Sequence, residues 1–299
     1  MSGHPKKISR TKGKETLIPE SRGALFFDSK TKYVKKVLMC KPIHFSVDYH
    51  INPWMKIGSV DKAKALSQWN KLVKSLQKQN IETKVIEQKR GFPDMVFAAD
   101  QAVIKNKDLV LSNFHYEERR NEVNEYLPWL EKENFTIYKL PRKCFFEGSG
   151  ECIWYGNILF VGTGFRNSST ACKFLSRFLG VETVCLELVS PYFYHLDTCL
   201  FVLNNETAFY YPSAFSKRSQ NVLKKLVKNL IPFEISEAKN FAANSFVTDH
   251  HVIAQKGNKS FLKEVENLGY KVIELDVSEF MKSGGGIHCL IQTLEEKYA

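Results

Sequence analysis

The chain has 299 residues, of which 43% are hydrophobic, and a formal net charge of +11 at pH 7. This composition supplies a large buried core and excludes a chain that is disordered throughout. No apolar run approaches the ~20 residues that span a bilayer, so we expect no membrane partner.

The positive charge is concentrated near the N-terminus. Residues 1–36 contain ten Lys or Arg against three Asp or Glu, so the rest of the chain is only mildly basic. We therefore predict a basic, disordered tail over residues 1–34 and one α/β domain over residues 35–299. A nucleic-acid-binding arm is the alternative interpretation of the tail, but the mildly basic body makes us expect no nucleic-acid partner.

Beyond the tail, the chain repeats a unit of two short strands, a helix and a third strand. The first helix is expected from about residue 59 to residue 80, with Leu66, Trp69, Val73 and Leu76 on one face. Later units open with hairpins near residues 101, 151, 198 and 247, and turn signals such as Asn106 separate their strands. A short strand is expected around residues 232–236 of the fourth unit.

The first unit lacks its own hairpin, and the C-terminal segment CLIQTLE (289–295) is able to supply the missing strand. Such a pairing would close the chain into a ring and hide its sheet edges. We therefore predict an α/β fold of five pseudo-symmetric ββαβ modules around a central pocket, a five-bladed α/β propeller. A two-domain α/β protein is the alternative.

The seven cysteines form no CxxC pair and have no zinc-type spacing, so we expect reduced thiols in a cytoplasmic protein. The last one, Cys289, follows a triple glycine in SGGGIHC (283–289), and a lone HLDT (195–198) lies much earlier. This pattern is typical of a cysteine nucleophile and a histidine that meet only in the folded state. The alternative is a buried structural cysteine after a glycine-rich turn.

Polar motifs stand at matching places in successive units, namely FPDMVFAAD (92–100), FFEGSGE (145–151), HLDT and SGGGIHC. A ring would bring them to one pocket containing Asp94, Asp100, Glu147, His195, Asp197 and Cys289. Crowded carboxylates repel one another unless a cation is bound, so we predict a small cationic substrate. A divalent metal is the alternative, but one histidine among irregularly spaced oxygens suits neither zinc nor calcium, and we expect no metal.

These motifs, together with LMCKPIHFSVDYHINPWM (38–55), resemble the guanidine-modifying superfamily. Its members include dimethylarginine dimethylaminohydrolases, arginine deiminases, arginine dihydrolases and glycine amidinotransferases. The resemblance covers roughly residues 35–295 and implies the same five-bladed α/β propeller. It also implies that Cys289 is the nucleophile, that His195 is the general acid and base, and that Glu147 belongs to the catalytic group.

The resemblance further implies a set of substrate-binding residues. Asp100 and Asp197 join Glu147 as the carboxylates around the guanidinium. Arg119 and Arg166 match positions that bind the substrate's α-carboxylate in the dimethylarginine hydrolases. Asn52 in INPWM and Asp94 complete the set. For Arg119 and its neighbour Arg120, surface pairing with glutamates of the same helix is an alternative.

These residue types fit one reaction. The Cys289 thiolate attacks the guanidinium carbon, His195 protonates the departing amine, and a covalent thiouronium forms. The same histidine then takes a proton from water, which releases a ureido product such as citrulline. This chemistry requires no cofactor.

Two departures from the superfamily pattern bear on the reaction. The common EGGD motif reads EGSG here, so Gly150 replaces an acidic residue, with Glu151 next to it. The INPWM and DMVF segments resemble arginine dihydrolases, whereas Asp100 resembles the deiminase and dimethylargininase pattern. We predict a hydrolase of arginine or N-methylated arginine. Alternatives are an amidinotransferase, an arginine dihydrolase, and a non-enzymatic ribosome-binding propeller protein.

Overall fold

The computed structural model describes residues 32–298. Most of the predicted basic tail lies outside the described residues. Strand β1 begins at Lys32, slightly before the expected domain boundary at residue 35. Among residues 32–298, no helix has the length and apolar character needed to cross a membrane.

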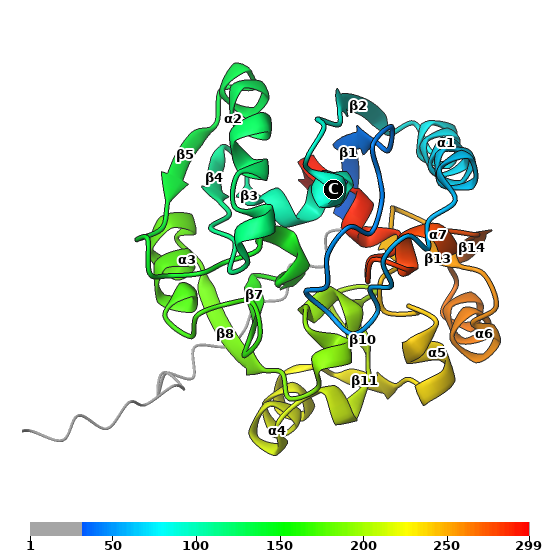
Figure 1. Ribbon diagram of the computed structural model, residues 1–299. Helices are drawn as coiled ribbons and strands as arrows, with labels where there is room; N and C mark the ends of the chain where they lie inside the picture. Colours follow the sequence, from blue (N-terminus) through cyan, green and yellow to red (C-terminus); the bar gives the residue numbers. More distant parts are fainter. Residues whose placement is uncertain (1–31, 299) are drawn as a thin grey trace, which may run out of the picture.

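Five three-stranded sheets make up the structure, in the orders β15-β1-β2, β3-β4-β5, β6-β7-β8, β9-β10-β11 and β12-β13-β14. In every sheet the middle strand pairs antiparallel with one neighbour and parallel with the other. Figure 1 shows the sheets arranged around a common centre, with the longer helices on the outside. The strands are β1 (Lys32–Lys41), β2 (Glu82–Glu87), β3 (Ala102–Lys105), β4 (Asp108–Leu111), β5 (Thr136–Lys139), β6 (Cys152–Tyr155), β7 (Ile158–Thr163), β8 (Glu182–Glu187), β9 (Leu200–Val202), β10 (Thr207–Tyr210), β11 (Asn229–Pro232), β12 (Phe246–Val247), β13 (His251–Gln255), β14 (Lys271–Leu275) and β15 (Gln292–Tyr298).

A helix connects the two parallel strands of each sheet, as the repeat predicts. These helices are α1 (Lys62–Lys78), α2 (Glu122–Lys132), α3 (Ala171–Leu179), α4 (Lys217–Leu226) and α6 (Lys259–Asn267). Two shorter helices, α5 (Ile235–Lys239) and α7 (Ser278–Met281), lie in connections. The strand expected around residues 232–236 lies a few residues earlier than predicted. Strand β11 ends at Pro232, and α5 begins at Ile235.

Helix α1 shows how sequence leads to packing. Asp61 caps its N-terminus by accepting a hydrogen bond from the backbone N–H of Lys64. The buried face is centred on Trp69, Leu72 and Leu76. It is therefore rotated slightly from the predicted stripe, and Leu66 and Val73 lie half-buried at its edge.

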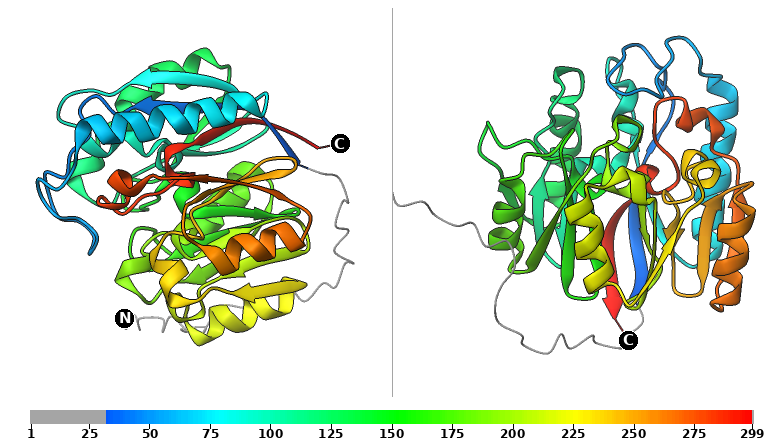
Figure 2. Two further views of the ribbon diagram at one scale, coloured as in Figure 1. Left: turned by 90° about the vertical axis from the view of Figure 1, so that its right-hand side faces the viewer. Right: turned by 90° about the horizontal axis from the view of Figure 1, so that it is seen from below.

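The last strand closes the first sheet. Strand β15 pairs antiparallel with β1, so that Thr293 lies opposite Val37 and Gln292 opposite Leu38. Figure 2 shows these two strands side by side in the middle of the molecule. The strand predicted for CLIQTLE is therefore confirmed, and the two ends of the described chain meet in one sheet.

The strands nearest the centre surround a cavity of about 770 Å³, which we call the axial cavity. Its lining comes from β3, β6, β9, β12 and β15. The hairpin turns at Asn106 and Gly156 also line it, and Asp197 and His288 line it beyond the opposite ends of these strands. Both turn residues have φ between 55° and 57°, a conformation that Asn and Gly adopt most readily.

One cysteine expectation is wrong. Cys172 in α3 and Cys185 in β8 form a disulfide with a Cα–Cα distance of 6.2 Å. Helix α3 leads directly into β8 and packs against it, which brings together two cysteines that are only 13 residues apart. The other five cysteines within residues 32–298, Cys289 included, are free and buried.

Candidate active site

Short 3₁₀ turns precede the central strands and carry the predicted site residues. Asp100 lies in the turn before β3, Glu147 directly before the turn of β6, His195 before the turn of β9, and Cys289 in the turn before β15. All four residues are at most 2% exposed. Because equivalent turns meet near the centre, the sequence motifs converge as predicted.

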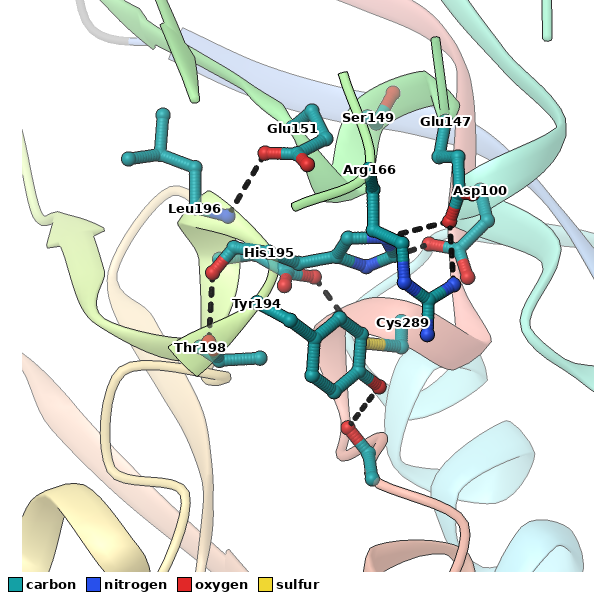
Figure 3. A network of polar contacts seen from close by, with 12 residues as sticks. Asp100, Glu147, Ser149, Glu151, Arg166, Tyr194, His195, Leu196, Thr198 and Cys289 are labelled. Carbon is teal, nitrogen blue, oxygen red and sulfur yellow. Dashed lines mark hydrogen bonds and ion pairs between the residues drawn. The ribbon is translucent and has the colours of Figure 1, made fainter. Parts of the chain in front are cut away.

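His195 lies between two carboxylates (Figure 3). Its Nε2 is 2.8 Å from Glu147 Oε2, and its Nδ1 is 3.7 Å from Asp100 Oδ1. Burial alone would lower the pKa of His195, but the Asp100 and Glu147 carboxylates outweigh it and raise this pKa to about 9. The imidazole is therefore protonated at neutral pH, in the form that a general acid needs.

Glu147 is held as a carboxylate by two cations. Arg166 Nη1 is 2.9 Å from Glu147 Oε2, the same oxygen that faces His195. Burial would raise the pKa of Glu147, yet Arg166 and His195 together lower it to about 2. The Arg166 guanidinium itself lies over the rings of Tyr116 and Tyr194, at 4.6 and 4.5 Å from their centroids.

Arg119 is the counter-ion of Asp100. Its Nη1 is 2.7 Å from Asp100 Oδ2, and its Nε and Nη2 form a bidentate pair with Glu122. The expectation that the carboxylates need a bound cation to offset their repulsion is thus wrong in part, because two buried arginines already neutralise Asp100 and Glu147. The surface-pairing alternative holds for Arg120, which pairs with the exposed Glu117.

With these pairs in place, Arg119 and Arg166 are committed to protein carboxylates in this structure. Their predicted role in binding the substrate's α-carboxylate therefore stays a prediction. Arg166 Nη2 also donates to the carbonyl of Ile51, and Arg119 Nη2 donates to the carbonyl of Asp94. Either arginine would have to share or exchange a partner to receive a substrate carboxylate.

The Cys289 thiol lies among an aspartate, an asparagine and a backbone turn. Its Sγ is 3.1 Å from Asp197 Oδ2 and 3.1 Å from Asn244 Nδ2. Burial raises the pKa of Cys289 well above its ordinary value, and the Asp197 and Asp100 carboxylates raise it further. The thiol of the empty site is therefore protonated at neutral pH.

The sequence analysis did not predict Asn244 as a site residue. Besides its contact with Sγ, its Oδ1 accepts from the backbone N–H of Cys289, and its Nδ2 donates to the carbonyl of Asp197. No motif distinguishes this asparagine in NFAANSF (240–246). The one available signal is its place just before β12, which corresponds to the places of Asp100 and Asp197 before β3 and β9.

Two buried carboxylate oxygens near the thiol lack hydrogen-bond partners within residues 32–298. They are Asp100 Oδ1 and Asp197 Oδ1. Buried acceptors without partners are costly, and a ligand that carries N–H donors would satisfy them. Asp197 contacts the thiol through its other oxygen, Asp100 Oδ1 lies 3.7 Å from His195 Nδ1, and both Glu147 oxygens are satisfied.

Asp94 and Asn52 hold neighbouring segments of the chain. Asp94 accepts hydrogen bonds from the hydroxyls of Tyr49 and Ser283, at 2.8 and 2.7 Å. Asn52 Nδ2 donates to the carbonyl of Ser283 at 3.0 Å. Both residues fasten the segment around residue 50 to the start of the glycine-rich loop, and their predicted contact with substrate stays a prediction.

The glycine-rich loop needs glycine for two reasons. Gly284 has a φ of 90°, a conformation that residues with a Cβ rarely adopt. A Cβ on Gly285 would lie 2.2 Å from the ring of Phe97, and one on Gly286 would lie 2.8 Å from Asn244 Oδ1. The close approach is thus made to protein side chains that surround Cys289.

Gly150 explains the departure from EGGD in steric terms. A Cβ here would lie 2.5 Å from Asp100 Oδ1 and 2.9 Å from His195 Nδ1. The missing side chain therefore lets Asp100 and His195 approach each other. The neighbouring Glu151 is buried, and its Oε2 accepts from the backbone N–H of Leu196. Burial raises the pKa of Glu151 to about 8.

Comparisons with known proteins agree with this fold. A family model described as "N,N dimethylarginine dimethylhydrolase, eukaryotic" matches residues 46–295. The N(G),N(G)-dimethylarginine dimethylaminohydrolase of Mycobacterium tuberculosis is 32% identical over 261 residues, covering 87% of this chain and 86% of that protein.

The bifunctional arginine dihydrolase/ornithine cyclodeaminase ArgZ of Synechocystis is 35% identical over 269 residues. The match covers 87% of this chain but only 38% of ArgZ, so the chain spans well under half the length of that relative. A crystal structure of the N-terminal domain of ArgZ, covalently bound to a reaction intermediate, superposes with a TM-score of 0.83 at 34% identity. It covers 86% of this chain and 96% of that domain.

The mixed α/β fold and the cluster of carboxylates, imidazole and thiol define a member of the guanidine-modifying, or pentein, superfamily. Within this superfamily, the chain belongs to the dimethylarginine dimethylaminohydrolase family.

Proposed function

We propose that this chain is a cysteine-dependent hydrolase of a guanidino substrate, arginine or N-methylated arginine, and that it acts through a covalent thiouronium. One observation carries the proposal. The buried Cys289 Sγ lies 3.1 Å from Asp197 Oδ2, and Asp197 and Asp100 each keep an oxygen without a hydrogen-bond partner, with that of Asp100 3.7 Å from the protonated His195. We further propose that the five sheets are the blades of a five-bladed propeller with this site at its centre.

A guanidinium fits the unsatisfied side of the site. Its planar N–H donors would reach Asp100 Oδ1 and Asp197 Oδ1, each through a charge-assisted hydrogen bond. The added positive charge would also lower the pKa of the neighbouring Cys289 thiol, because opposite charge favours the thiolate. Substrate binding and nucleophile activation are therefore coupled in this proposal.

The chemical steps follow from the protonation states. The Cys289 thiolate attacks the guanidinium carbon, and the carbon–nitrogen bond to the leaving amine breaks as the His195 imidazolium protonates that nitrogen. Glu147, whose pKa of about 2 keeps it ionised, orients the imidazole and stabilises its cation. The neutral His195 then takes a proton from water, and the hydroxide attacks the thiouronium and releases a ureido product.

An arginine dihydrolase is the second candidate. The observation in its favour is the 35% identity to the arginine dihydrolase relative, which exceeds the 32% identity to the mycobacterial dimethylarginine hydrolase. A dihydrolase would hydrolyse the ureido product again and release ornithine. The aspartate at position 100 is the feature of this chain that favours a single hydrolysis, in line with the deiminase and dimethylargininase pattern.

Product analysis separates these candidates. The purified protein is incubated with arginine, monomethylarginine and dimethylarginine, and citrulline, ornithine, ammonia and methylamines are quantified. We expect citrulline with one equivalent of amine, and no product from Cys289→Ser, because the hydroxyl has a far higher pKa than the thiol. Ornithine with two equivalents of ammonia would favour the dihydrolase. A folded protein that converts none of the three compounds would refute the proposed function.

A further inference from the structure

His288 has no role in the mechanism above, yet it is hydrogen-bonded to the same carboxylate oxygen as the nucleophile. Its Nδ1 is 2.9 Å from Asp197 Oδ2, and that oxygen is 3.1 Å from Cys289 Sγ. One carboxylate oxygen thus joins the thiol to an imidazole in a continuous hydrogen-bonded chain.

The thiol needs a proton acceptor other than His195. The two nitrogens of His195 face Glu147 and Asp100, and a pKa of about 9 keeps its imidazole protonated at neutral pH. Cys289 is itself protonated in the empty site. The attacking thiolate can form only if its proton leaves through another group.

The axial cavity gives His288 the access to solvent that the catalytic residues lack. The His288 side chain is 24% exposed, whereas the Asp197 side chain is 2% exposed. His288 and Asp197 both line the cavity. The other charged groups in the lining are Lys105, Glu182, Glu295 and Glu296, which come from β3, β8 and β15.

We propose that His288 is a proton-relay residue that accepts the Cys289 proton through Asp197 when a guanidinium binds, and passes it to solvent in the axial cavity. The proton shared by Asp197 Oδ2 and His288 Nδ1 moves onto Nδ1 as the S–H bond of Cys289 breaks and the thiol proton takes its place on Oδ2. The resulting imidazolium then releases its Nε2 proton to the cavity. The thiolate keeps the electron pair and attacks the substrate.

This inference deepens the proposed function and rests on it for its trigger, the guanidinium. The relay itself can be measured without turnover. Chloroacetamidine carries a cationic amidine that resembles the guanidinium, and it alkylates thiolates. Its rate of reaction with Cys289, located by peptide mass mapping across a pH series, reports how readily the thiol loses its proton.

Variants of His288 separate a relay from a packing role. In His288→Asn, the amide can still hydrogen-bond to Asp197 but cannot carry a proton. His288→Ala leaves space in which imidazole added to the buffer can stand in for the side chain. His250→Asn is the matched control, because it removes an imidazole that is 72% exposed and lies away from the site.

We expect alkylation at pH 7 to slow at least about tenfold in both His288 variants, and the deficit to shrink above about pH 10, where hydroxide takes the proton directly. Added imidazole should restore the rate of His288→Ala, and His250→Asn should react like wild type. Unchanged rates in His288→Asn would overturn the relay. It would also be overturned by a slow His288→Ala that imidazole fails to rescue, or by a wild-type Cys289 that resists alkylation at every pH. Alkylation that depends on His288 in a protein that converts no guanidine would instead uphold the relay and refute the proposed function.

Discussion

The two sides of the site differ in how well their polar groups are satisfied. On the histidine side, Arg166 and His195 both form short ion pairs with Glu147 Oε2, and Glu147 Oε1 accepts from the backbone N–H of His115. Towards the thiol, Asp197 and Asp100 each keep one buried oxygen without a hydrogen-bond partner in the described part of the chain, and that oxygen of Asp100 lies 3.7 Å from His195 Nδ1. Both oxygens of Glu147 thus have partners without a ligand, whereas Asp197 and Asp100 each have one oxygen that does not.

This difference corresponds to two tasks within one buried cluster, namely holding the imidazole in place and binding a cationic ligand. A fully paired network fixes the position and charge of His195, the proposed general acid, before substrate arrives. An unsatisfied pair of carboxylate oxygens is costly in the empty protein, and a cationic ligand recovers that cost on binding. Substitutions on the histidine side should therefore reduce both stability and catalysis, whereas those on the thiol side should mainly reduce binding and catalysis.

The largest combined effect is expected from Glu147→Gln. The change leaves Arg166 and His195 without their shared anion in a buried site, and losing one partner of such a pair costs about 3 to 5 kcal/mol. Because Glu147 also raises the pKa of His195, the fraction of His195 that is protonated at neutral pH should fall as well. Denaturant unfolding and steady-state kinetics should show both losses. Wild-type stability in this variant would contradict the distinction between the two sides.

A smaller and more selective effect is expected from Asp100→Asn. Guanidine binding should weaken by at least about tenfold, because one charge-assisted hydrogen bond to the ligand is lost. Stability should fall less than in Glu147→Gln, since Arg119 keeps its bidentate pair with Glu122 and the amide oxygen can still accept from it. Calorimetric titration with arginine in a Cys289→Ser background isolates binding from turnover. A large loss of stability with unchanged affinity would assign Asp100 to the structure alone.

The smallest effect is a pH dependence at Glu151. Its pKa is raised by burial to about 8, above the ordinary value for a free glutamate, so the folded protein binds this proton more tightly than the unfolded chain. The free energy of unfolding should therefore fall as pH rises between about 4.5 and 8. In Glu151→Gln this decline should be weaker, and the melting temperature should exceed that of wild type most clearly near pH 8. If the melting temperatures of both proteins change with pH by the same amount from pH 5 to pH 8, the prediction that Glu151 is uncharged in the folded protein is refuted.

The repeat and its motifs made much of this structure predictable. Hairpin turns such as that at Asn106, the closing pair of β1 and β15, and the meeting of Asp100, Glu147, His195 and Cys289 follow from position within a repeated unit. The pairings among the site residues were less accessible. The sequence placed Arg119 among glutamates of its own helix, and only the packed structure brings it to Asp100.

Asn244 and His288 are two further residues whose contacts could not be predicted from the sequence. Asn244 belongs to no recognisable motif, and His288 lies within SGGGIHC without a signal of its own, because an asparagine before a short strand and a histidine beside a cysteine are ordinary local sequences. Their contacts with Cys289 and Asp197 depend on how separate modules meet at the centre. The sequence identified the charged groups and the thiol at the centre of the site. It could not identify the neighbours that form hydrogen bonds to them.

The mass of the protein quenched during turnover tests the covalent role of Cys289 most directly. With arginine, we predict a species heavier than the free enzyme by the mass of the substrate minus its leaving amine, located on the peptide that contains Cys289. This species should accumulate in His195→Asn, where no general base activates water, if the amine can still depart, and it should be absent from Cys289→Ser. Turnover that proceeds in Cys289→Ser, or an adduct located on any other residue, would contradict a thiouronium on Cys289.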